Sequence, residues 1–192
     1  MEWASFWAGD DMKKHFNPET YILLGIPAVF FLGALFHFLY ELSGNLPAVG
    51  MIAPVNESVF EHMKLASLPV ALWWGIGALF LKKWLRPNAW FTAALLSMVT
   101  AIVTIPLLHY FHTGAFGIHS VAVDILNFLL SVTLGQLLGL HLYRHCRGMD
   151  WRLSLLLMLA ILVLFAALTL SPPGLPLFRD PETGMYGMVP GQ

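Results

Sequence analysis

The chain has 192 residues, of which 58% are hydrophobic and only 11% charged, and its formal net charge is −1. Soluble domains carry roughly 25% charged residues, so the composition excludes an ordinary soluble domain and predicts a membrane protein. The near-zero net charge leads us to expect no nucleic-acid partner, and the single cysteine, Cys146, excludes an internal disulfide.

Residues 1–17 contain charged residues and tryptophans but no continuous apolar run, so we expect no cleavable signal peptide there. Five apolar stretches follow, each long enough for the ~20 residues with which a helix crosses a bilayer. Asn17, Asn88 and Asp150 are the expected helix caps before the first, third and fifth stretch. The five predicted spans cover residues 18–42, 57–85, 89–112, 120–145 and 151–170.

The predicted fold is therefore all-α: a polytopic membrane helix bundle of five transmembrane helices. The spans make up one domain, residues 18–170, between an N-terminal segment, residues 1–17, and a tail, residues 171–192. Basic residues occur before the first span and in the second and fourth connections, and they are absent from the first and third connections. Since basic loops stay in the cytoplasm, we expect the N-terminus inside, the C-terminus outside, and a multi-pass location in the inner (cytoplasmic) membrane.

With this orientation, polar and ionisable residues gather at the outer ends of the first four spans. Charged groups at a membrane are costly and are therefore functional candidates. Glu57, Glu61 and Lys64 are expected to form one stripe of the second helix. The members of the predicted cluster are His37, Glu41, Glu57, Ser58, Glu61, His62, Lys64, His109, His112, His119 and Asp124.

Histidine and carboxylate side chains are ligands that zinc and other borderline divalent cations accept. The expected metal ligands are His37, Glu41, Glu57, Glu61, His62, His119 and Asp124. A metal ion there would activate water and hydrolyse a lipid or a peptide at the membrane surface. Glu57 or Glu61 would be the general base, and Ser58 would stabilise the oxyanion or orient a ligand.

The sequence leaves three other interpretations of the polar cluster open. Ser58 and Glu61 match a capping box, and Lys64 can neutralise Glu61, so the cluster can be a purely structural polar network. The acidic groups and histidines can also relay protons or bind a cation. Finally, two histidines from different spans, such as His37 and His109, can ligate a haem in an accessory subunit of a larger membrane complex.

The run Pro-Val-Asn-Glu-Ser-Val-Phe-Glu-His-Met-Lys-Leu, residues 54–65, follows His37-x-x-x-Glu41. This pattern resembles a family of small bacterial multi-pass membrane proteins of unknown function, which shows Asn-Glu-Ser-x-aromatic-Glu-His-x-Lys-Leu before its second span. Residues 176–187 are similar to the tail of that family. The resemblance covers most of the chain and implies the same fold and the same polar site, but it implies no particular reaction.

Overall fold

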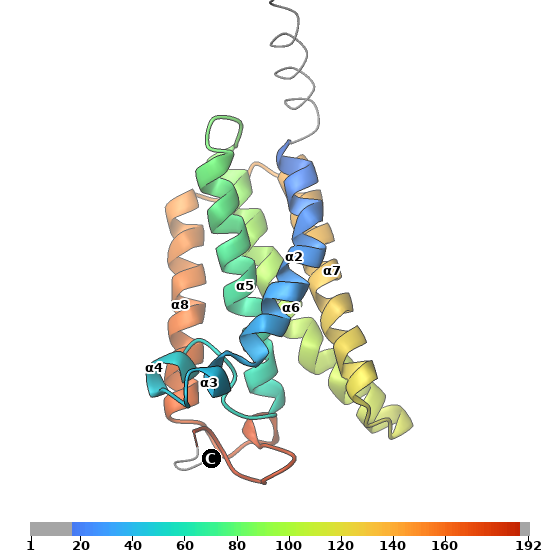
Figure 1. Ribbon diagram of the computed structural model, residues 1–192. Helices are drawn as coiled ribbons and strands as arrows, with labels where there is room; N and C mark the ends of the chain where they lie inside the picture. The colour runs from blue at the N-terminus through green and yellow to red at the C-terminus, as the bar shows by residue number, and fades with distance from the viewer. Residues whose placement is uncertain (1–16, 189–192) are drawn as a thin grey trace, which may run out of the picture.

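The computed structural model describes residues 17–188. Within them, five long helices lie side by side and two short helices and a 3₁₀ turn lie at one end of the bundle (Figure 1). The long helices are α2 (Pro18–His37), α5 (Val59–Phe80), α6 (Pro87–Phe116), α7 (Val121–His145) and α8 (Trp151–Leu170), and the short elements are α3 (Leu39–Leu42), α4 (Pro47–Gly50) and η1 (Pro176–Phe178).

Two of the three expected helix caps are confirmed. The Asn17 carboxamide oxygen accepts from the Thr20 N–H at 2.8 Å, and the Asp150 carboxylate accepts from the first N–H groups of α8. The third was wrong: α6 begins at Pro87, one residue before Asn88, because proline is favoured at the first helical position. Asn88 instead accepts from the Trp151 N–H at 3.1 Å and links α6 to the start of α8.

The predicted spans are present, but several of their boundaries differ, most of all the ends of the first three. The first span is interrupted at Phe38, which has turn geometry, so that α3 continues as a separate short helix. The second helix ends at Phe80 instead of residue 85. The third continues to Phe116 and stops at Gly117, whose φ of 64° is a left-handed conformation that glycine adopts readily.

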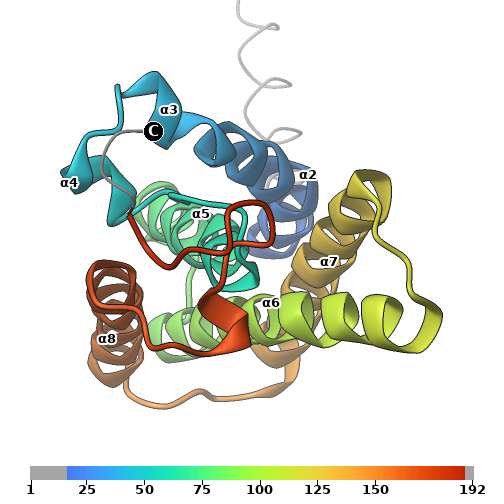
Figure 2. The same ribbon diagram turned by 90° about the horizontal axis from the view of Figure 1, so that it is seen from below.

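Helix α5 occupies the centre of the bundle, with α2, α6 and α8 packed against it (Figure 2). Helix α7 packs against α6 and α2, and small and polar residues lie on its packed face. On this face the Asn127 side chain donates to the Ile105 carbonyl at 3.1 Å, and Gly135 allows close approach to the Ser97 carbonyl.

The outer surface of the bundle is apolar. Large side chains such as Phe31, Leu79 and Leu107 are 69%, 78% and 66% exposed, respectively. All five long helices are apolar and long enough to cross a bilayer. The chain is therefore a multi-pass membrane protein whose exposed apolar side chains face lipid.

The C-terminal tail folds over the end of the bundle where α5 begins (Figure 1). The Phe178 ring is buried on Phe60, with ring centroids 4.3 Å apart, and Phe60 stacks in turn on Phe165 of α8. The Asn56 side chain donates to the Gly187 carbonyl at 3.0 Å. The tail therefore holds the segment before α5 in place.

Replacing Phe178 by alanine should detach the tail, because the ring supplies its main apolar contact. We expect a loss of about 3 kcal/mol, as for other buried phenylalanines, measured as a lower midpoint of thermal unfolding in detergent. Phe116→Ala is the matched control, because that ring is 65% exposed. Equal effects of the two substitutions would contradict the docking of the tail.

Candidate functional site

A buried ion pair lies at the start of α5. The Lys64 ammonium is 2.6 Å from the Glu61 carboxylate, and both side chains are only 2% exposed. Lys64 also donates to the carbonyl groups of Gly50 and Ala53, at 2.7 and 3.0 Å. A buried charge needs a partner of opposite sign and further hydrogen bonds, and Lys64 has both.

The Glu61 carboxylate completes this network. It accepts from the Val55 N–H at 3.0 Å and from the Thr169 hydroxyl of α8, also at 3.0 Å. The ion pair thus joins the segment of residues 50–55 to α5 and α8. The contacts of Glu61 and Lys64 are those expected of a structural polar network. The structure does not bring Glu61 together with the other expected metal ligands.

Ser58 sets the exact start of α5. It is the N-cap residue, its hydroxyl accepts from the Glu61 N–H at 3.3 Å, and its own N–H donates to Asn56 at 2.9 Å. Because Ser58 is fully buried and serves as a cap, its hydroxyl does not point into an open site. Glu57 therefore precedes the helix, and the expected stripe of Glu57 with Glu61 and Lys64 was wrong.

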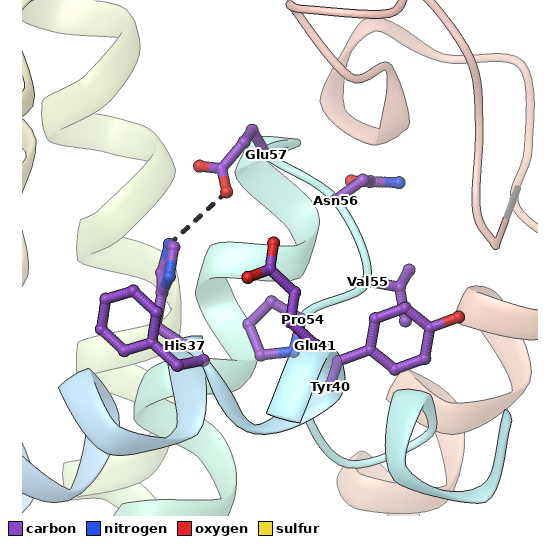
Figure 3. A pocket seen from close by; sticks show the side chains of 8 residues that line it. His37, Tyr40, Glu41, Pro54, Val55, Asn56 and Glu57 are labelled. Atoms are coloured by element: carbon purple, nitrogen blue, oxygen red, sulfur yellow. Dashed lines mark ion pairs between the residues drawn. The ribbon is translucent and has the colours of Figure 1, made fainter. Parts of the chain in front are cut away.

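Glu57 instead meets two histidines. Its carboxylate oxygens lie 3.6 Å from His37 Nε2 and 3.4 Å from His62 Nε2, and the two imidazole rings are 5.5 Å apart. One ligand atom from each residue lies within 4.8 Å of the others. We call His37, Glu57 and His62 the first triad; Figure 3 shows its contact between His37 and Glu57.

Two further interactions orient and polarise the groups of the first triad. His62 Nδ1 is 3.0 Å from the Ser58 carbonyl and donates to it, so that Nε2 is the ring nitrogen that faces Glu57. Hydrogen bonding to His37 and His62 holds the pKa of the Glu57 carboxyl well below its ordinary range, against the opposing effect of partial burial. Glu57 is therefore ionised, as a metal ligand must be.

An open pocket of about 90 Å³ lies beside the first triad. Its lining includes His37 and Glu57 of the triad together with Tyr40, Glu41 and Asn56. The Glu41 carboxylate points into this space below Glu57 (Figure 3). Glu41 is thus close to the triad without belonging to it, in a position open to solvent.

Asp124 belongs to a different group. Its Oδ1 lies 3.2 Å from His109 Nδ1 and 3.4 Å from His112 Nε2. These three residues, which we call the second triad, again offer ligand atoms within 4.8 Å of one another. His119 is exposed and in neither triad. The polar cluster predicted as one site is therefore divided into two triads and a separate ion pair.

Two features of this end of the bundle, the second triad and the Thr169 hydroxyl, have only weak signals in the sequence. The His109-x-x-His112 spacing at a helix end is the signal for the second triad, but it is a weak one by itself. Thr169 is the one polar residue within residues 155–170, and its hydroxyl bonds to Glu61. A single polar residue in such an apolar span therefore indicates that its side chain has a buried polar partner.

The comparisons with known proteins give the family of the chain and add no activity. A model of a family of unknown function, DUF6512, matches residues 11–188. The chain belongs to this family. No curated protein and no solved structure matches the chain.

Breaking the buried ion pair should destabilise the protein strongly. Lys64→Met leaves the Glu61 charge buried without its cation, for which we expect a loss of about 3–5 kcal/mol. Glu61→Gln combined with Lys64→Met removes both charges and should lose less. The midpoints of thermal unfolding in detergent give the order of stability of the wild type, Lys64→Met and the double variant.

The control for this comparison is the exposed pair of Glu19 and Arg144. Glu19→Gln should leave the midpoint almost unchanged, because water screens an exposed pair. If the double variant at residues 61 and 64 is as unstable as Lys64→Met alone, the pairing of the two charges is not what stabilises the protein here.

Proposed function

We propose that the protein is a membrane metalloprotein that binds a divalent cation, with zinc the expected ion, at His37, Glu57 and His62. The observation that carries this proposal is the convergence of two imidazole nitrogens and one ionised carboxylate from α2, α5 and the segment before α5. Two histidines and a glutamate form the ligand set of many zinc hydrolases, which keep a further position for water.

We further propose that the bound cation serves hydrolysis of a lipid or a peptide at the membrane surface. A cation lowers the pKa of bound water and polarises a carbonyl or phosphoryl oxygen. Glu41 is the best-placed general base, because it lines the open pocket beside the triad. Glu61 is less suited to this role, since Lys64, Val55 and Thr169 already occupy its carboxylate.

The distribution of basic residues supports a site on the outer side of the membrane. Lys82, Lys83, Arg86, Arg144, Arg147 and Arg152 lie in or beside the connections at the other end of the bundle from the triad. Basic connections stay in the cytoplasm. The triad would then face the outside of a cytoplasmic membrane, within reach of lipid head groups and of extracytoplasmic peptides.

Removing ligands of the first triad should abolish binding at that site. Zinc titration of the detergent-purified, chelator-treated chain measures this by calorimetry. Glu57→Gln and the double variant His37→Asn, His62→Asn should each weaken that binding by more than the ~10–100-fold typical of residues outside the ligand shell. His119→Ala is the matched control and should bind as the wild type does. Unchanged zinc binding in Glu57→Gln and in the double variant His37→Asn, His62→Asn would contradict the proposal.

Glu41→Gln separates binding from catalysis. This variant should keep its bound zinc but lose hydrolysis of fluorogenic phospholipid ester or peptide substrates by about 10²–10⁴-fold, the usual contribution of a general base. Glu182→Gln is a control, because Glu182 is an exposed residue of the tail outside the pocket. If zinc-loaded wild type hydrolyses no member of such a panel, hydrolysis is refuted and metal binding alone stands.

A further inference from the structure

We propose that a second divalent cation binds at His109, His112 and Asp124, so that the end of the bundle holds two metal ions. This extends the proposed function by a second ion but depends on different side chains. The second triad repeats the chemistry of the first, with two imidazole nitrogens and one carboxylate. It is built entirely from α6 and α7, whereas the first triad comes from α2, α5 and the segment between them.

The strongest evidence is the state of His112. Its side chain is only 10% exposed, and its Nδ1, 3.1 Å from the Ile118 carbonyl, donates to it. Its Nε2 is fully buried and has no hydrogen-bond partner, although it lies 3.4 Å from Asp124 Oδ1. With the proton on Nδ1, Nε2 carries a lone pair that faces a carboxylate, which also only accepts hydrogen bonds.

A cation between these atoms resolves this unfavourable arrangement. A buried acceptor without a donor is unfavourable, and a lone pair opposite a carboxylate oxygen adds repulsion. A divalent ion attracts both groups. His109 Nδ1 donates to Asp124 Oδ1 at 3.2 Å in the metal-free site, and it would release this proton on binding the ion and supply a third ligand. The Ile118 carbonyl then has the role of the outer-shell acceptor that orients most metal-binding histidines.

The local backbone keeps these three residues together. Gly117 ends α6 in a left-handed conformation, and the next residue, Ile118, donates its N–H to the His112 carbonyl at 3.2 Å. About three turns before the end of α6, the Ile105 carbonyl accepts from Asn127 of α7. The hairpin of α6 and α7 is thus tied on both sides of the second triad.

The two triads lie at the same level of the bundle. Close contact joins Gly33 to Leu65 and to Phe128, and these residues lie about one turn inward from His37, His62 and Asp124, respectively. The two ions would therefore be held at the same end of the bundle.

The test is the number of zinc ions bound per chain, measured by elemental analysis after equilibrium with zinc and removal of the free ion. Wild type should bind two. The double variant His112→Asn, Asp124→Asn should bind one, as should His37→Asn, His62→Asn, and the combination should bind none. Asparagine keeps a donor near the Nδ1 position, and thermal unfolding without zinc verifies that each variant is folded. His119→Ala should still bind two.

The outcomes separate this inference from the proposed function. One ion in wild type that disappears only in the His37, His62 variant would overturn the second site and leave the first. One ion that disappears only in the His112, Asp124 variant would support the site proposed here and overturn the first. Failure of wild type to retain any zinc would overturn both.

Discussion

The arrangement of the whole site depends on one buried ion pair. Lys64 and Glu61 are removed from water, and a pair so deeply buried is stable only if its remaining hydrogen bonds are made. The groups that make them are carbonyls of residues 50 and 53, the Val55 N–H and the Thr169 hydroxyl. Satisfying the pair therefore fixes the segment before α5 against α8. Glu57 follows directly on that segment, so its position between two histidines is a consequence of the same constraint.

The ion pair and the triads divide the polar residues into two functions. Groups with complete hydrogen-bond shells are buried and hold the bundle, whereas the triads are partly exposed and bring imidazole nitrogens within 3.2–3.6 Å of a carboxylate. Among these nitrogens, His112 Nε2 is buried and lacks a donor. A membrane helix bundle tolerates such groups where a cation or a substrate satisfies them, and both triads lie at the end of the bundle where water and solutes have access.

The sequence predicted the five spans well because apolar runs of about 20 residues have few other uses. Their ends depend on local geometry that composition does not show, such as the break at Phe38. For the site, the sequence predicted that His37, Glu57, His62 and Asp124 gather at one end. It could not show that Ser58 caps α5 and so separates Glu57 from Glu61. Nor could it show which helices are neighbours in cross-section, and this decides that Asp124 meets His109 and His112.

Zinc K-edge X-ray absorption tests the central claim, that the first triad binds a divalent cation, most directly. The sample is the zinc-loaded His112→Asn, Asp124→Asn variant, in which only the first triad can bind. The account predicts a shell of nitrogen and oxygen ligands at about 2.0–2.2 Å, with the outer-shell scattering of two imidazole rings per zinc. A shell of oxygen atoms without imidazole scattering would contradict it, because the metal would then be held by groups other than His37 and His62.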